Sequence, residues 1–316
     1  MTAGRILRHT RLFVLAWLIL AGGCMRLPIV AQTPLKAATG IELESSLRDL
    51  EPDLDLFRFR GPFVVGTQNN RELQLPGGER INTDRFLSAP AGKAPLVIIL
   101  HGQDSSKEAH TFQAMHLASW GMHSLTIQLP RGGPWADNGR LLARIVALIH
   151  RSPEVIDRRV DVGRIILVGH SFGGYAVAVA LAEGAPATGA ILLDPAAAGR
   201  DVPKFLQQIQ RPVMLLGADD ELYSTRNRGS YYRFIRSNIA EVSIRNAAHE
   251  DAQYPSEASL QNFGIDTTTS EELQITFASA LTSAAFSLSA TGTFEYAWQS
   301  FGAVLESGKF FNARRK

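Results

Sequence analysis

The chain has 316 residues, of which 45% are hydrophobic and 20% are charged. This composition is typical of a folded globular protein and excludes a disordered chain, a collagen-like repeat and a protein with many membrane spans. The formal net charge is +2, and the N-terminal stretch supplies Arg5, Arg8 and Arg11 with no acidic residue. Without these three, 29 basic residues face 30 acidic ones, so the remaining chain lacks the basic excess expected of a nucleic-acid-binding protein.

The N-terminal segment has the pattern of an export signal. The basic stretch that ends at Arg11 precedes an uncharged apolar run from Leu12 to Met25. That run is shorter than the roughly 20 residues that a membrane-spanning helix needs. We therefore predict a secretory signal peptide over residues 1–23.

The only cysteine, Cys24, follows Leu20-Ala21-Gly22-Gly23. This arrangement resembles the bacterial lipobox, in which small residues precede a cysteine that is lipidated and becomes the new N-terminus. The resemblance implies a protein held at a membrane of the cell envelope by a lipid anchor. The alternative is an ordinary signal peptide cleaved after Ala31. In either case a single cysteine excludes an internal disulfide.

After the leader, residues 24–60 mix prolines, small residues and charges without a clean period, and we interpret them as a tether. Two strand-like runs follow, Phe63–Val65 and Glu72–Leu75. The turn signal Pro76-Gly77-Gly78 then predicts that Arg80–Ser88 pairs back as an antiparallel strand.

From Leu96 the pattern changes to short apolar runs that alternate with helical segments such as Asn138–His150. Continuous apolar runs favour strands buried on both faces of a parallel sheet, and their alternation with helices indicates a doubly wound α/β fold. The predicted strands are Leu96–Leu100, His123–Ile127, Ile165–Val168, Ile191–Leu193, Val213–Leu216 and, more weakly, Val242–Ile244.

The region from residue 61 to residue 316 is expected to form one domain. Only 17 residues, Pro195–Arg211, separate two of its strands, which leaves no room for a separate lid domain. Helical stretches are predicted at Ser270–Leu288 and Thr293–Leu305, before a basic end.

The sequence Gly169-His170-Ser171-Phe172-Gly173 has the G-x-S-x-G pattern. It lies between a predicted strand and a small-residue helix, the strand–turn–helix setting of a nucleophile elbow. A serine held in such a strained turn needs neighbours without side chains two positions before and after it. The pattern therefore predicts that Ser171 is a catalytic nucleophile.

From about Phe63 to Pro255 the chain resembles the α/β-hydrolase superfamily, and more specifically its lidless dienelactone-hydrolase-like, cutinase-like and chlorophyllase-like esterases. His101-Gly102-Gln103 follows a strand where that family has its H-G-x oxyanion loop. The resemblance implies that the backbone N–H groups of Gln103 and Phe172 hold the oxyanion. His101 itself is expected to pack at the base of the loop.

A serine hydroxyl needs an adjacent base to become a strong nucleophile. His249 lies just after the last predicted strand, where this family places its base. Of the other histidines, His9 is in the leader, and His170 adjoins the nucleophile at a sharp turn. The rest fall on helical segments or begin a strand: His110, His116, His150 and His123.

The acid partner of His249 has three candidates. The family's usual G-x-x-D turn after the Val213–Leu216 strand favours Asp220, and Asp219 replaces it if the turn is tighter. Asp194 also ends a strand, and chlorophyllase-like and phospholipase-like members place their acid there. Asp220 is preferred. Glu250 and Asp251 flank the base, and adjacency on one loop makes them poor partners.

Four aromatic residues are candidates for the wall of a substrate pocket: Trp135, Tyr223, Tyr231 and Tyr232. For each of them, packing against a helix is an equal or better interpretation. Metal binding is not expected, because no H-E-x-x-H or clustered cysteine–histidine spacing occurs.

These features together predict a serine esterase that needs no cofactor and acts on a small-molecule or lipid ester, with Ser171, His249 and Asp220 as its triad. A lactonase, thioesterase or peptidase would use the same triad. A non-catalytic envelope lipoprotein that keeps the fold is the alternative outside enzymes.

Overall fold

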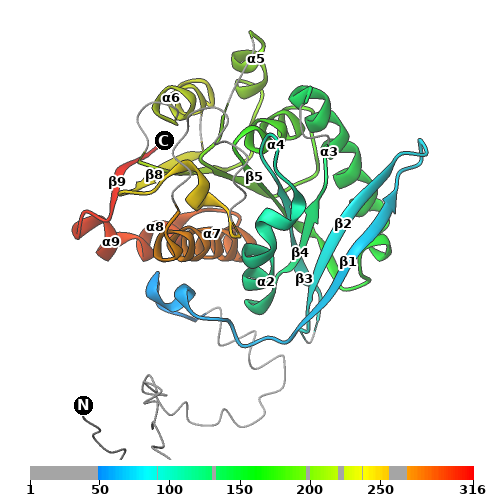
Figure 1. Cartoon of the computed structure of the whole chain (residues 1–316), viewed down its shortest axis with the longest axis horizontal. Coiled ribbons are helices and arrows are strands. Elements are labelled where there is room, and N and C mark those ends of the chain that lie inside the picture. Colours follow the sequence, from blue (N-terminus) through cyan, green and yellow to red (C-terminus); the bar gives the residue numbers. More distant parts are fainter. Residues whose placement is uncertain are drawn as a thin grey trace, which may run out of the picture. The chain divides into compact units, whose positions relative to one another are not determined.

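In the part of the chain that the structure describes, nine strands form one sheet in the order β1-β2-β4-β3-β5-β6-β7-β8-β9 (Figure 1). The structure is a computed structural model, and it describes residues 49–90, 92–129, 133–196, 200–219, 224–236, 238–255 and 269–316. The predicted leader, Cys24 and Ala31 lie outside these residues.

The central strands are parallel, as predicted, and almost every residue in them is buried. Burial on both faces explains why they appear in the sequence as continuous apolar runs. They are β3 (Ala94–Leu100), β4 (His123–Ile127), β5 (Val160–His170), β6 (Gly189–Leu193), β7 (Val213–Gly217) and β8 (Ile239–Ile244).

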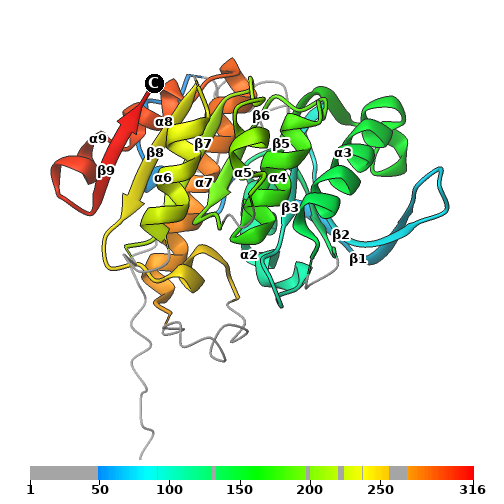
Figure 2. The same ribbon diagram turned by 90° about the horizontal axis from the view of Figure 1, so that it is seen from above.

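Helices cover both faces of the sheet (Figure 2). One face carries α3 (Trp135–Arg151), α4 (Phe172–Ala182), α5 (Val202–Leu206) and α6 (Ser224–Phe234). The other face carries α2 (Thr111–Ser119), α7 (Glu271–Thr291), α8 (Glu295–Ser300) and α9 (Gly302–Glu306). Short 3₁₀ turns complete the fold: η1 (Asp55–Arg58), η2 (Lys107–His110), η3 (Pro153–Val155) and η4 (His249–Ala252). The fold is thus a doubly wound α/β sheet.

The antiparallel hairpin at the N-terminal edge is longer than predicted. β1 (Val65–Gln74) joins the two expected runs into one strand, which pairs with β2 (Arg80–Ser88) and has a register shift between Gln68 and Arg71. Its residues before Leu73 are mostly exposed and polar. An exposed edge strand shows little hydrophobic alternation, so this part of β1 has no strand pattern in the sequence.

The expected tether, residues 24–60, needs a correction at its C-terminal end. Leu54 is 4% exposed and Phe57 is fully buried, and the Phe57 ring lies 4.8 Å from that of Trp120. η1 packs against α7. The last part of this segment therefore belongs to the folded domain.

One helix in the described part of the chain, α7, is long and apolar enough to cross a membrane. Its most apolar window is 72% buried inside the fold, where it packs against the sheet and α2. We therefore interpret α7 as a core helix.

Candidate active site

The predicted nucleophile elbow is present. β5 ends at His170, α4 begins at Phe172, and Ser171 between them has φ 53° and ψ −127°. A positive φ is rare and strained for a residue with a side chain. Backbone hydrogen bonds hold it in place, from the Ser171 N–H to the Leu193 carbonyl at 3.0 Å and from the Ala196 N–H to the Ser171 carbonyl at 2.9 Å.

The two glycines of the motif are required by close approaches of the backbone. A Cβ at Gly173 would lie 2.4 Å from the His101 carbonyl oxygen, and a Cβ at Gly169 would lie 2.4 Å from the Gly173 carbonyl oxygen. No side chain fits at either position. This agrees with the reason given for the motif from its sequence.

The predicted oxyanion loop lies against the nucleophile. A Cβ at Gly102 would be 2.9 Å from the Cβ of Ser171 and 3.5 Å from its Oγ. Within the described residues, the backbone N–H groups of Gln103 and Phe172 have no hydrogen-bond acceptor. Two unused donors next to a serine hydroxyl are the arrangement that an oxyanion hole needs.

His101 is buried at the base of this loop and has a defined tautomer. The Leu129 N–H donates to its Nε2 at 3.1 Å, so the proton is on Nδ1, which donates to the Gly102 carbonyl at 2.7 Å. In a trans peptide the carbonyl and the following N–H point in opposite directions. His101 therefore turns the Gln103 N–H away from itself, a more specific role than packing.

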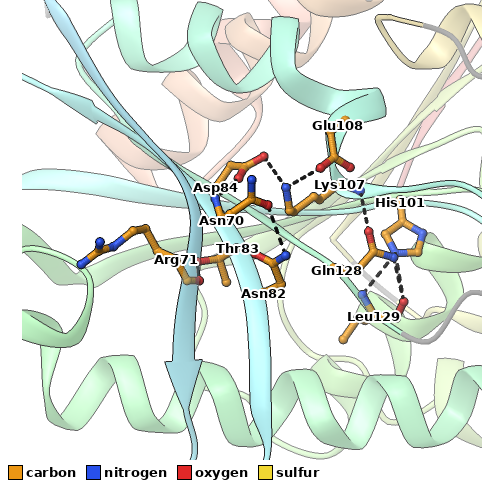
Figure 3. Close-up of polar contacts among 10 residues, drawn as sticks. All are labelled: Asn70, Arg71, Asn82, Thr83, Asp84, His101, Lys107, Glu108, Gln128 and Leu129. Atoms are coloured by element: carbon orange, nitrogen blue, oxygen red, sulfur yellow. Dashed lines mark hydrogen bonds and ion pairs between the residues drawn. The ribbon is translucent and has the colours of Figure 1, made fainter.

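A buried ion-pair cluster supports the loop from the hairpin side (Figure 3). Lys107 Nζ lies 2.7 Å from Asp84 Oδ2 and 2.5 Å from Glu108 Oε1, and the Lys107 side chain is 2% exposed. Burial opposes the charge of Lys107, but these two carboxylates outweigh it and raise the Lys107 pKa. The Lys107 N–H donates to Gln128 Oε1 at 3.1 Å, and Gln128 Nε2 donates to His101 Nε2 at 2.9 Å.

The residue that faces the predicted base is Asp194. His249 Nδ1 lies 2.5 Å from Asp194 Oδ2, and both side chains are fully buried. The preferred acid, Asp220, lies outside the described residues. Asp219 instead accepts the Asn246 N–H at 2.8 Å. Of the three candidates, the structure therefore brings Asp194, the second, into contact with the base, and the preference for Asp220 stays a prediction.

Asp194 stays ionised although it is buried. Burial alone would raise its pKa, but the hydrogen bond and charge of His249, the charge of Arg228 and the Ala218 N–H together hold the Asp194 pKa well below its usual range. Oδ2 faces His249, while Oδ1 accepts the Ala218 N–H at 3.1 Å and a hydrogen bond from Arg228 Nη1. The carboxylate is therefore fixed in orientation as well as in charge.

Two further histidines lie behind the base. The ring of His170 is 4.5 Å from that of His249 and 5.9 Å from that of His110. Burial is the main cause that lowers the His110 pKa to about 3 and depresses the His170 pKa well below its usual range. Both rings are therefore neutral, and His170 Nε2 donates to the His249 carbonyl at 3.1 Å.

The loop that carries His249 is held to the other side of the site. Gln113 Nε2 on α2 donates to the Ala252 carbonyl at 3.1 Å, and Ser105 Oγ after the oxyanion loop donates to Gln253 Oε1 at 3.3 Å. Asp251 accepts the Ala248 N–H at 2.8 Å. Asp251 thus closes its own turn, in agreement with its exclusion as a partner of the base.

The aromatic candidates differ in position. Trp135 is 8% exposed and stacks on Phe172 with ring centroids 5.7 Å apart, so it packs directly behind the elbow. Tyr231 is buried and donates to the Ala196 carbonyl at 2.8 Å, and Tyr232 lies under the guanidinium of Arg314. Both tyrosines therefore pack within the fold, and Tyr223 lies outside the described residues.

The fold and this arrangement define the class, an α/β hydrolase with a serine at the nucleophile elbow. The family model of the alpha/beta hydrolase family matches residues 96–289. Because that match covers more than half of the chain, the protein belongs to the alpha/beta hydrolase family, and membership supports hydrolase activity. No curated protein matches the chain. Within the described residues, no group of three or more histidine, cysteine, aspartate or glutamate side chains could hold a metal ion.

Sequence reasoning missed Arg228, whose guanidinium contacts the carboxylate partner of the base. It lies on α6, 34 residues after Asp194, and no motif includes it. A long side chain that crosses from a helix to a strand end leaves no periodic signal. The one available hint was Gly217 at the end of a buried strand. A glycine in a strand often marks a place where another group approaches the backbone closely.

Proposed function

We propose that this protein is a carboxylic-ester hydrolase that works through an acyl-enzyme on Ser171, with His249 as general base and Asp194 as the acid of the triad. The observation that carries the proposal is the strained Ser171 together with the His249–Asp194 contact of 2.5 Å. The likeness to lidless esterases, stated above on the sequence motifs, favours an ester over a long peptide.

The chemistry follows the serine-hydrolase scheme. Ser171 Oγ attacks the ester carbonyl while His249 accepts its proton, and Asp194 stabilises the imidazolium that forms. The N–H groups of Gln103 and Phe172 stabilise the oxyanion, which is worth about 3–4 kcal/mol per donor in such sites. His249 then protonates the leaving alcohol, and water attacks the acyl-enzyme in the second half of the reaction.

Hydrolysis of nitrophenyl esters of increasing chain length tests this function. We expect turnover by the wild-type protein and none by Ser171→Ala, which should unfold at nearly the same temperature because the serine hydroxyl is retained for chemistry. Turnover by the alanine variant would refute the assignment of the nucleophile. A panel of lactones, thioesters and peptides assayed in parallel assigns the substrate class, and inactivity towards all of them would favour a non-catalytic lipoprotein.

We also propose that the enzyme acts at the bacterial cell envelope, lipidated on Cys24. The support is the short apolar run after three arginines and the lipobox-like sequence before Cys24. The wild-type protein should partition into detergent with the membrane fraction, and Cys24→Ser should release it or leave it unprocessed. A secreted soluble protein that starts at residue 32 would refute lipidation.

A further inference from the structure

A buried row of charges runs from the triad acid to the C-terminal strand. Arg228 Nη1 donates to Asp194 Oδ1, and Arg228 Nε lies 3.5 Å from Glu241 Oε1 on β8. Glu241 in turn pairs with Arg314 on β9 (Phe310–Arg315) at 2.7 Å. Arg228 is 1% exposed and Glu241 is 3% exposed. Charges this deeply buried are costly unless each one is compensated.

The fold makes room for this guanidinium. A Cβ at Gly217, the last residue of β7, would lie 2.3 Å from both Cζ and Nη1 of Arg228. The guanidinium therefore lies directly over the backbone of β7, one residue before the Ala218 N–H that also donates to Asp194. Arg228 Nη2 donates to Ser243 Oγ at 3.2 Å, which fixes its other side.

We propose that Arg228 is a positioning residue for catalysis, which orients the Asp194 carboxylate towards His249 and sets, together with Glu241, how strongly that carboxylate favours the imidazolium. The inference rests on the proposed function, because it assigns Arg228 a role in the same reaction. Arg228 donates to Oδ1 and so leaves Oδ2 for the ring N–H of His249. The positive charge of Arg228 partly offsets the negative charge of the Asp194 carboxylate that faces His249.

Other charged and titratable groups lie around the base. His170 on β5 adjoins His249, and His110 on η2 adjoins His170. Glu250 and Asp251 follow His249 on η4, where Glu250 accepts from Gln253 and Asp251 accepts two backbone N–H groups. None of these groups is changed in the variants below. A difference in pH profile between the variants therefore reports on Arg228 and Glu241.

The sign of each effect follows from Coulomb's law. Arg228→Met removes a positive charge and leaves Glu241 without its buried cation, so the imidazolium of His249 persists to higher pH and the base is lost sooner on acidification. Glu241→Gln removes a negative charge, and the effect has the opposite sign and is smaller. Arg228→Met/Glu241→Gln restores neutrality, so its profile returns towards that of the wild type.

The experiment measures kcat/KM for 4-nitrophenyl butyrate against pH with the full chain, since this profile reports the free enzyme. We expect the acidic limb to move to higher pH by roughly half to one unit in Arg228→Met. A smaller downward shift is expected in Glu241→Gln, and an intermediate position in the double variant. Arg233→Met, which removes an exposed cation from the same helix, should leave the limb in place. An acidic limb at the same pH in all five proteins would overturn the proposal.

Two further variants keep the test valid if Arg228→Met does not fold. Arg228→Lys keeps the positive charge but lacks the planar guanidinium with its several N–H donors. The acidic limb of its pH profile should therefore stay at the wild-type pH, while kcat should fall several-fold. Gly217→Ala keeps both charged groups and displaces the guanidinium, because the added Cβ would lie 2.3 Å from its Cζ, so it should lower kcat with little change in KM. Wild-type kcat in both of these variants would also overturn the proposal.

A spectroscopic measurement separates this inference from the proposed function. The proton between His249 Nδ1 and Asp194 Oδ2 should give a far-downfield ¹H resonance in the full-length protein, whether or not any ester is hydrolysed. We expect it to shift or broaden in Arg228→Met and to be unchanged in Arg233→Met. An unchanged resonance in Arg228→Met would contradict the proposal, whereas an inactive wild-type protein would contradict only the proposed function.

Discussion

Two buried ion-pair clusters flank the candidate active site, and they differ in how they reach it. On the acid side, Arg228 contacts the carboxylate that faces the base. On the oxyanion side, Lys107 pairs with Asp84, and its backbone N–H is connected to the oxyanion loop through Gln128 and His101. The first cluster includes a group of the proposed triad, whereas the second supports the backbone on which the oxyanion donors lie.

Burial of an ion pair does not by itself indicate a catalytic role. The central pairs, Arg228–Asp194 and Lys107–Asp84, are both almost fully enclosed, and removing either cation would leave a buried carboxylate without its ion-pair partner. What separates them is the partner of that carboxylate. Asp194 faces His249, while the other oxygen of Asp84 accepts only the Asn70 N–H of the hairpin at 2.7 Å. The acid side should therefore govern turnover, and the oxyanion side should govern stability.

The largest expected effect is on the acid side. Asp194→Asn should lower kcat by about 10⁴-fold with little change in KM, because an asparagine favours the wrong tautomer of the base. The matched controls are Asp219→Asn and Asp220→Asn, which should keep wild-type turnover of the nitrophenyl ester. A larger loss in Asp220→Asn than in Asp194→Asn would mean that the carboxylate partner has been misassigned.

The next effect is on the oxyanion side. Lys107→Met leaves Asp84 buried without its cation, so we expect the free energy of unfolding to fall by about 3–5 kcal/mol. At a temperature where the variant is still folded, kcat should change far less than in Asp194→Asn. Urea unfolding measures the first quantity, with the exposed Lys204→Met as control. If Lys107→Met instead had wild-type stability and a strongly reduced kcat, the expectation that the oxyanion side governs stability would be wrong.

The smallest effect concerns two buried, neutral histidines, His110 beside His170 and His123 at the start of β4. In the unfolded chain a histidine gains its proton below about pH 6.5, whereas the folded-state pKa values are depressed, to about 3 for His110 and about 4 for His123. Their stabilising contribution is therefore complete above pH 6.5 and is lost as the pH falls towards those values. Each such histidine should lower the free energy of unfolding by about 1.4 kcal/mol for every pH unit of acidification in this range.

His110→Phe tests this dependence with a matched ring. Between pH 6.5 and pH 5 the variant should lose about 2 kcal/mol less of its unfolding free energy than the wild-type protein. Urea unfolding at the two pH values gives the comparison. Equal losses in the two proteins would mean that His110 is protonated in the folded state.

The sequence predicted most of the sheet, because strands buried on both faces are continuous apolar runs. It did not predict β9 (Phe310–Arg315), whose sequence has two phenylalanines and a basic end. That strand is held by pairing with β8 and by Arg314, which meets Glu241. η1 was missed for a related reason. Leu54 and Phe57 lie among charged residues in a segment without a clean hydrophobic period, and only tertiary packing shows that they are buried.

In the site, Ser171 and His249 could be proposed from the sequence. Ser171 lies in a strand–turn–helix motif whose glycines have a steric reason, and His249 follows the last predicted strand, where the family places its base. The choice among the aspartates could not be made from the sequence, because all three follow strand ends and only the turn decides where a carboxylate points. Asp194 has φ 38°, a left-handed conformation that aspartate tolerates, and it turns its carboxylate towards His249. Sequence spacing does not report that angle.

The central claim is that Ser171 is activated by His249, and labelling with a fluorophosphonate tests it most directly, because the probe reacts with an activated serine whatever the natural substrate is. Peptide mapping should find one adduct, on Ser171, in the wild-type protein. The labelling rate should fall by several orders of magnitude in His249→Ala, with the folded state confirmed by thermal unfolding. An adduct on another residue, or an unchanged labelling rate in His249→Ala, would contradict the account.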